Sequence, residues 1–229
     1  MKVTLKPNEK LEDLQYDGLA VIQSEDEYRF TTDAVLLANF CSDMKGKLCV
    51  EFCAGCGVIS ILVAAKKHPA RVVAIELQPN LADMAKRSVE HNGMQNVIEV
   101  ICQDVKDAYK TLSKPADVVV CNPPYRKLGS GERQLEHNIA LCRHEIAITL
   151  QEVIIAAAKT LNNRGTFYLV HQAERVAEIV SLCAENHLAV KEIAPVCARA
   201  GKEPNLILIR AVKGGGQDCK LRLPIYVEN

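Results

Sequence analysis

Short apolar runs alternate with helical patterns along most of this 229-residue chain. Parallel strands need long crossover connections, so the alternation predicts a mostly parallel sheet with helices on both faces. The two final runs follow one another without a helix, which predicts an antiparallel edge. We therefore expect an α/β fold with a seven-stranded, doubly wound, mostly parallel sheet. The predicted strands span residues 48–52, 71–77, 97–102, 117–121, 165–171, 188–196 and 205–212.

A short hairpin is predicted ahead of this sheet. Residues 18–22 and 28–30 have strand patterns, and the polar segment 24–27 between them is typical of a turn. We expect one domain, with residues 1–32 as a hairpin extension and 33–229 as the core. The predicted helices are 34–38, capped by Thr32 or Asp33, then 58–68, 79–91, 144–161 and 176–183.

The composition is ordinary for a globular protein, with 48% hydrophobic residues, 24% charged residues and a formal net charge of zero. Zero net charge argues against a protein that coats nucleic acid without specificity. No signal core and no membrane-length apolar run are visible, so we expect a cytoplasmic protein with no membrane contact, and we favour a monomer. Most of the ten cysteines lie in apolar runs, which predicts buried thiols without disulfides.

The segment from residue 191 onward has a weak positive excess, seven basic residues against four acidic ones. An ordinary solvated surface and a local nucleic-acid contact both explain such a bias. The charged segment 126–138 is predicted to be a loop near the substrate.

The motif Asn122-Pro123-Pro124-Tyr125 directly follows the predicted strand 117–121. Ligands bind at this end of strands in open α/β sheets. The Asn122 amide oxygen and the Pro123 carbonyl can accept both hydrogens of a planar NH2 group, and Tyr125 can stack on the ring or amide that carries it. The motif therefore suits chemistry on an amine of a nucleobase or an amide. The alternative is an ordinary strand end followed by a turn.

Three further strand ends predict a site for an adenosine group. Gly55 and Gly57 connect the first strand of the sheet to its helix and allow a ligand close to the backbone. Glu76 ends the next strand, where a carboxylate can accept both ribose hydroxyls. Asp104 follows the third strand, where it can lie by an adenine edge. A dinucleotide fingerprint would need glycine or alanine where Ser60 stands, so the match to that class is imperfect.

Cys53 and Cys56 form a Cys-x-x-Cys pair at the start of a predicted helix. Thiol pKa values fall at such positions, which raises a redox or zinc role as an alternative. Zinc needs four ligands and the sequence has no second pair, so we expect no metal site.

The loop 51–57, Glu76, Asp104 and the motif 122–125 resemble the S-adenosylmethionine-dependent class I methyltransferases. More narrowly, nearly the whole chain is similar to the bacterial tRNA(Val) adenine-N6-methyltransferase family. This resemblance implies a Rossmann-like fold and S-adenosyl-L-methionine as the cofactor. Segments 11–15, 32–38, 143–146 and 203–206 carry the narrower resemblance.

The resemblance also implies roles for individual residues. The loop residues hold the methionine end of the cofactor, Glu76 binds the ribose hydroxyls and Asp104 lies by the adenine. A helix-capping aspartate closes over the site, and the proline motif holds the target base. The implied cofactor-binding residues are Asp33, Glu51, Gly55, Gly57, Glu76, Asp104 and Asn122, and the implied catalytic residues are Asn122, Pro123 and Tyr125.

One position departs from the pattern of the family, whose loop usually has glycine where this chain has Cys53. A side chain there can crowd the methionine part of the cofactor, so we expect Cys53 to affect cofactor affinity.

The implied activity is methylation of adenine N6 in tRNA next to the anticodon. A protein glutamine N5-methyltransferase and an rRNA guanine N2-methyltransferase are alternatives that hold their targets in the same way. Glutamine enzymes usually carry a helical domain before the glycine loop, whereas only about 47 residues precede the first core strand here. A cofactor-binding interaction module, or an NAD-dependent dehydrogenase, would leave residues 122–125 unexplained.

Overall fold

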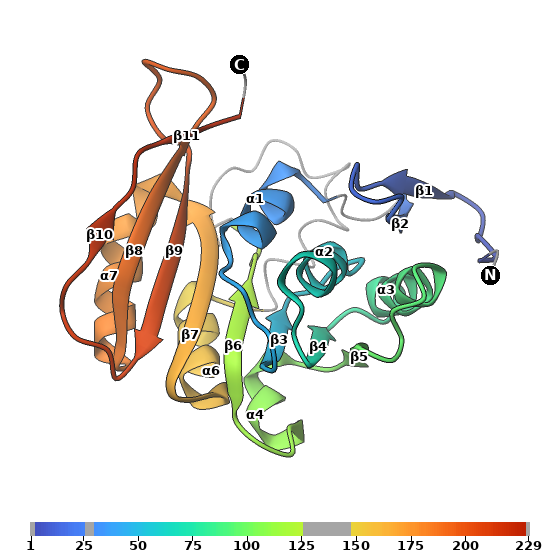
Figure 1. Ribbon diagram of the computed structural model, residues 1–229, viewed down its shortest axis with the longest axis horizontal. Helices are drawn as coiled ribbons and strands as arrows, with labels where there is room; N and C mark the ends of the chain where they lie inside the picture. Colours follow the sequence, from blue (N-terminus) through green and yellow to red (C-terminus); the bar gives the residue numbers. More distant parts are fainter. Residues whose placement is uncertain (1–2, 26–29, 126–147, 228–229) are drawn as a thin grey trace, which may run out of the picture.

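The computed structural model describes residues 3–25, 30–125 and 148–227. Its centre is a mixed sheet in which seven long strands follow the order β8-β9-β7-β6-β3-β4-β5 (Figure 1). Only β9 among these seven runs against its neighbours, β7 and β8. The predicted mostly parallel α/β fold is therefore confirmed. The strands are β3 (Leu48–Phe52), β4 (Arg71–Glu76), β5 (Ile98–Cys102), β6 (Ala116–Cys121), β7 (Leu161–Gln172), β8 (Leu188–Cys197) and β9 (Leu206–Lys213).

Helices cover both faces of this sheet (Figure 1). The face toward the viewer carries α1, α2 and α3, and the opposite face carries α4, α6 and α7. Each face builds its own cluster of buried apolar side chains, so the sheet is apolar on both sides. The helices are α1 (Thr32–Phe40), α2 (Val58–Lys67), α3 (Pro79–His91), α4 (Ala108–Thr111), α6 (Leu150–Thr160) and α7 (Val176–Glu185), with short 3-10 turns η1 (Val105–Asp107) and η2 (Ala173–Arg175).

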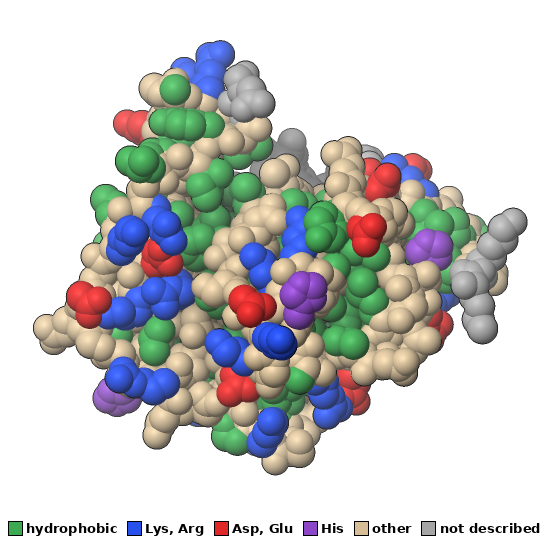
Figure 2. All heavy atoms as spheres, in the orientation of Figure 1, with side chains coloured by type: hydrophobic (Ala, Val, Ile, Leu, Met, Phe, Trp, Pro, Cys, Tyr) green, Lys and Arg blue, Asp and Glu red, His purple; other side chains and the backbone are tan. Residues whose placement is uncertain are grey.

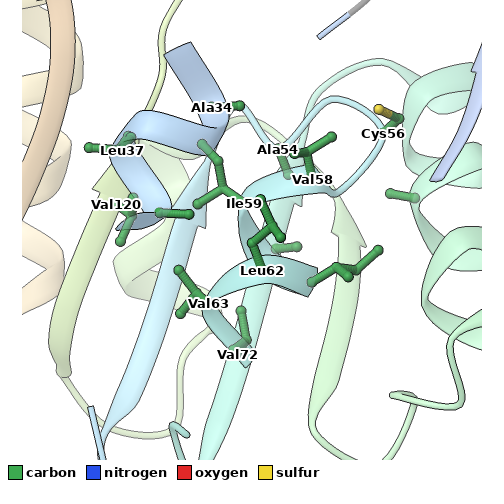
Figure 3. Close-up of a cluster of buried hydrophobic side chains, with 14 of the residues drawn as sticks. Ala34, Leu37, Ala54, Cys56, Val58, Ile59, Leu62, Val63, Val72 and Val120 are labelled. Carbon is green, nitrogen blue, oxygen red and sulfur yellow. The ribbon is translucent and has the colours of Figure 1, made fainter. Parts of the chain in front are cut away.

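The packing of α1 and α2 shows how the sequence fixes this arrangement. Leu37 of α1 and Leu62 of α2 have no exposed surface, and both lie over the sheet near Val120 and Val72 (Figure 3). Burying one such leucine side chain contributes about 1.5–3 kcal/mol. These contacts hold the first turns of both helices next to the carboxyl ends of the central strands.

The helix predicted over 144–161 begins later than expected. Residues up to 147 lie outside the described residues, and α6 begins at Leu150. Thr149 and Glu152 form a reciprocal capping box there, which satisfies free backbone N–H groups at a defined start.

The N-terminal hairpin is present, and one of its two strands was not predicted. Strand β1 (Glu9–Asp13) pairs antiparallel with β2 (Ala20–Ser24), and Leu11 lies opposite Ile22. Four of the five β1 residues are charged, so no apolar pattern marks this strand. The turn falls at residues 14–19, and the segment 26–29, which was predicted to hold a turn and part of a strand, lies outside the described residues.

Two very short strands were not predicted. Strands β10 (Lys220–Leu221) and β11 (Ile225–Tyr226) both pair parallel with β8, so the described residues contribute nine strands to this sheet. Two residues are too few to carry a strand pattern. Among the described residues, no helix is long and apolar enough to cross a membrane.

Candidate active site

The predicted site residues meet at one edge of the sheet. Strands β5, β4, β3 and β6 are parallel neighbours, so their carboxyl ends lie side by side. Helix α1 comes from outside this edge and brings one more candidate to it. The residues gathered there are Asp33, Glu51, Gly55, Gly57, Glu76, Asp104, Asn122, Pro123 and Tyr125.

The glycine loop between β3 and α2 is left-handed at both glycines. Gly55 has a φ of 55° and Gly57, the residue before α2, a φ of 89°. A Cβ built on Gly57 would lie 3.4 Å from the Ala85 Cβ, whereas one built on Gly55 would meet no protein atom within 4 Å. The loop therefore leaves open space beside its backbone, which fits a ligand held close to the chain.

Cys53 has the same left-handed backbone, with a φ of 56°. This conformation raises the free energy of a residue with a Cβ by about 1–2 kcal/mol, which explains why glycine suits the position better. Its neighbour Cys56 is buried, and burial raises its thiol pKa to about 12. The lowered pKa expected at a helix start therefore does not hold for Cys56. No group of three metal-binding side chains occurs within the described residues.

Glu76 connects the glycine loop to the end of β4. Glu76 as a whole is 5% exposed, and its carboxylate accepts the backbone N–H of Gly55 at 2.8 Å and that of Gln78 at 2.9 Å. Each carboxylate oxygen keeps a further lone pair for a hydroxyl donor. The geometry therefore fits the two hydroxyls of a ribose lying along the loop.

Glu51 lies deeper than the sequence suggested. It accepts the backbone N–H of Ser60 at 2.8 Å and the Ser60 hydroxyl, and it is 1% exposed. Burial raises the pKa of Glu51 to about 8, although the Ser60 hydrogen bonds act against the shift. Glu51 is therefore protonated at neutral pH, and its role at the methionine end of the cofactor stays a prediction.

Ser60 itself was missed as a site-supporting residue, because it was considered only as a departure from a glycine fingerprint. The available signal was a polar side chain within an otherwise apolar helix face.

Asp104 lies beyond the end of β5, one strand further out than Glu76. Its carboxylate accepts the backbone N–H of Lys106 at 2.9 Å and lies 3.2 Å from the Lys106 ammonium. The side chain is 32% exposed, so one side of the carboxylate remains open. This position fits the outer, adenine end of a cofactor that begins at the glycine loop.

The motif after β6 forms a hydrogen-bonded group with α1. The Tyr125 hydroxyl lies 2.6 Å from the Asn122 amide oxygen and 2.9 Å from a carboxylate oxygen of Asp33. A tyrosine hydroxyl carries one proton, so it donates to only one of these acceptors at a time. The buried Pro123 carbonyl accepts no hydrogen bond from the described residues.

His171, at the end of β7, was also missed by the sequence analysis. Its ring centroid lies 5.1 Å from that of Tyr125, and it is 1% exposed. The only signal was a histidine that closes an apolar run. Segment 126–138, predicted to lie near the substrate, and segment 143–146 lie outside the described residues.

A methyl donor and an amine must meet in one place for N-methylation, and this edge places a carboxylate whose geometry fits a ribose beside two oxygen atoms that can accept hydrogen bonds from an amine. The class defined in this way is that of the S-adenosylmethionine-dependent methyltransferases. The chain belongs to the methyltransferase small domain family, whose model matches residues 21–192. Its cofactor is accordingly S-adenosylmethionine.

Curated relatives cover most of the chain. The tRNA1(Val) (adenine(37)-N6)-methyltransferase of Bacteroides thetaiotaomicron is 27% identical over 198 residues, which are 85% of this chain and 81% of that protein. The protein of the same name from Aeromonas hydrophila is 28% identical over 185 residues, 80% of this chain and 76% of its own.

Solved structures agree on the fold. A predicted O-methyltransferase of Agrobacterium tumefaciens superposes with a TM-score of 0.67 at 25% identity, covering 85% of this chain and 86% of its own. TYW2 of M. jannaschii in complex with AdoMet superposes with a TM-score of 0.59 at 14% identity, covering 92% and 87% of the two chains. At that identity the second likeness concerns the fold alone.

Proposed function

We propose that this methyltransferase acts on the exocyclic N6 amine of an adenine in tRNA, next to the anticodon. The observation that carries the proposal is the group formed by Asn122, Tyr125 and Asp33 beside the glycine loop. Together with the Pro123 carbonyl, this group provides two oxygen acceptors for an amine, and the aromatic ring of Tyr125 lies next to them. The two tRNA1(Val) (adenine(37)-N6)-methyltransferases similar to this chain support adenine as the target.

S-adenosylmethionine, when bound, supplies a methyl group on a positively charged sulfur that is already activated for transfer. The protein therefore needs to hold and orient the amine. The Asn122 amide oxygen and the Pro123 carbonyl can accept the two N6 hydrogens, which favours a pyramidal nitrogen whose lone pair is available. No strong base is needed at this stage, since a proton leaves after transfer.

The Tyr125 hydroxyl explains how Asn122 becomes free for the amine. Without substrate, this hydroxyl lies within hydrogen-bond distance of both Asn122 and Asp33. When an amine approaches Asn122, the Tyr125 proton can turn fully to the Asp33 carboxylate. The exchange replaces one hydrogen bond by another, so it costs little free energy. Tyr125 then keeps its position while its ring lies against the base.

The seven basic residues from position 191 onward support a nucleic-acid substrate. Four of the seven are bonded within the fold, since Lys191 pairs with Asp218, Arg210 and Arg222 pair with Glu192, and Lys213 donates to two carbonyls. The remaining three basic side chains are exposed and carry the positive excess of this segment. They are Arg199, Lys202 and Lys220, which form no ion pair with the described residues.

Arg199 and Lys202 lie on the loop 198–205 between β8 and β9. Strand β8 is antiparallel to β9 and β9 to β7, so this loop leaves the sheet at the same edge as the site. It projects from the body of the molecule in Figure 1, and Figure 2 shows Lys and Arg side chains at its tip. A phosphate backbone bound near the site can contact this loop.

The direct test is transfer of a labelled methyl group to tRNA(Val) transcripts, followed by digestion to nucleosides and mass spectrometry. We expect N6-methyladenosine from a transcript with adenine at position 37, and no product when guanine replaces that adenine. Methylation that persists in the guanine transcript, or label found only in protein, would overturn the proposal in favour of another amine.

A further inference from the structure

His171 is a buried polar residue beside the proposed target site. Strands β6 and β7 are parallel with Leu169 opposite Cys121, so His171, two residues further, lies level with the start of the motif 122–125. Its ring contacts the ring of Tyr125 at a centroid distance of 5.1 Å, with the planes inclined by 57°. The mechanism described above leaves this residue without a role.

The hydrogen bonds of His171 define its state. Its Nδ1 accepts the backbone N–H of Gln172 at 2.8 Å. A neutral imidazole with an accepting Nδ1 carries its proton on Nε2. Burial lowers the pKa of His171 to about 4. The positive charge of Arg175 also lowers this pKa, whereas the negative charge of Glu178 raises it. The ring is therefore neutral at physiological pH, and Nε2 is a donor.

This donor has no acceptor within the described part of the chain, although its atom is fully buried. A buried donor without a partner destabilises a fold by about 1–3 kcal/mol, and an apolar ring of similar size would avoid that cost. Such an exception needs an explanation. A ligand that enters beside Tyr125 and presents an acceptor would supply one.

We propose that the Nε2–H of His171 donates a hydrogen bond to a ring nitrogen next to the amine of the target base. The inference rests on the proposed function, since adenine carries its N6 amine between two acceptor nitrogens, N1 and N7. Asn122 and Pro123 then receive the amine hydrogens, and His171 recognises the neighbouring nitrogen. His171 is in this account a substrate-binding residue that selects for adenine.

Three substitutions separate this role from a structural one. His171→Phe keeps the ring against Tyr125 but removes the donor. His171→Gln carries an amide N–H near the place of Nε2, whereas the matched control His171→Asn carries its amide near the place of Nδ1. We expect about a tenfold loss of kcat/KM in the Phe and Asn variants and recovery of most of it in the Gln variant.

The unfolding temperature provides an independent readout. His171→Phe removes an unsatisfied buried donor but also the Nδ1 acceptor of the Gln172 N–H, and these two effects oppose each other, so its unfolding temperature should change little while its activity falls. Its affinity for S-adenosylhomocysteine should match that of the wild-type protein. If all three variants lose stability and activity in parallel, His171 has only a packing role and the proposal is overturned.

The closing experiment pairs the Phe variant with altered substrates. Transcripts carry adenine, 1-deazaadenine or 7-deazaadenine at the target position, and kcat/KM is measured for both proteins. For one of the two analogues, the loss of kcat/KM should be about tenfold larger in the wild-type protein than in His171→Phe. The reason is that the nitrogen missing from the analogue and the donor missing from the variant form the same hydrogen bond. Changes in the intrinsic reactivity of the amine cancel in this ratio.

The outcomes distinguish the two proposals. Coupling to either deaza analogue supports the donor role and names the nitrogen that it binds. Equal losses in both proteins for both analogues would overturn the role of His171 while leaving adenine methylation intact. If the wild-type protein methylates no adenine transcript at all, the proposed function fails, and the adenine contact of His171 fails with it.

Discussion

The two halves of the site are held together in different ways. In the proposed cofactor half, made of the loop 53–57, Glu51, Glu76 and Asp104, buried or partly buried carboxyl groups accept backbone N–H groups. The proposed target half is made of Asp33, Asn122, Pro123, Tyr125 and His171. There the Tyr125 hydroxyl has one proton for two side-chain acceptors, and the buried Nε2–H of His171 has no partner among the described residues.

This difference indicates when each half reaches its working geometry. Backbone hydrogen bonds to Glu76 form together with the fold, so the cofactor half is built before any ligand arrives. The acceptors of the target half are partly used by one another, and a substrate must replace those bonds. We therefore expect substitutions in the cofactor half to change cofactor affinity, and substitutions in the target half to change the transfer step.

The largest expected effect is that of Asn122→Ala. Loss of one of two oxygens that favour the reactive amine should lower kcat by about 100–1000-fold, while S-adenosylhomocysteine binds as in the wild-type protein. Asn162→Ala is a matched control, since Asn162 bonds Asp117 at 2.6 Å at the opposite end of the sheet. Steady-state kinetics and calorimetric titration measure the two quantities, and near wild-type turnover in Asn122→Ala would refute its role.

Glu76→Gln should weaken cofactor binding and leave kcat nearly unchanged, which is the opposite of the effect expected for Asn122→Ala. A glutamine offers one oxygen where the carboxylate serves Gly55, Gln78 and a ribose, and its NH2 group opposes a backbone N–H. We expect S-adenosylhomocysteine to bind about 10–100-fold more weakly, measured by calorimetry, with a small change in kcat at saturating cofactor. Unchanged affinity would mean that the loop holds the cofactor without this carboxylate.

Charge reversal on the loop 198–205 tests how far the target half extends. The double variant Arg199→Glu, Lys202→Glu should raise the KM for tRNA about tenfold and make binding less dependent on salt, by about one unit of slope for each lost phosphate contact. Lys45→Glu, Lys47→Glu is the control, because those exposed lysines lie by the amino ends of the strands. Equal effects of both pairs would point to nonspecific attraction.

The shared hydroxyl can be tested by a double-mutant cycle. Tyr125→Phe and Asp33→Ala should each lower kcat/KM roughly fivefold, and the double variant should lose little more, since each change breaks the same bond. The exposed Asp43 provides a control position for the aspartate change. Fully additive losses would show that Asp33 and Tyr125 act independently.

Glu51 predicts a pH dependence of stability in the cofactor half. Because its pKa is raised from 4.5 to about 8, the folded protein holds a proton that the unfolded chain releases. The stability contributed by this proton is full below about pH 4.5 and is lost as the pH rises to about 8. The free energy of unfolding in urea, wild type minus Glu51→Gln, should therefore fall between about pH 5 and 8. A difference that stays constant over that range would contradict a buried, protonated Glu51.

The sequence was sufficient for the main architecture because the parallel strands of the sheet are rich in apolar residues and alternate with helical patterns. It failed for β1, where four charged residues hide a strand, and for β10 and β11, which are too short to form a pattern. In these places the pairing depends on contacts with distant segments, which a local pattern does not contain.

Site residues were predictable where a polar residue ends or directly follows an apolar strand, as Glu76 and Asn122 do. Contacts between distant residues were not derivable from local pattern, and the proximity of Asp33 to the site came only from the family resemblance. Ser60 and His171 were not predicted, because a single polar residue inside an apolar run gives no periodic signal. Their partners Glu51 and Tyr125 were both predicted as site residues.

Nucleoside mass spectrometry of tRNA from cells that lack this gene is the decisive test of adenine methylation. We expect that a methyladenosine disappears from tRNA(Val), returns with the wild-type gene and stays absent with Asn122→Ala. An unchanged set of tRNA nucleosides, or recovery by the Asn122 variant, would contradict it.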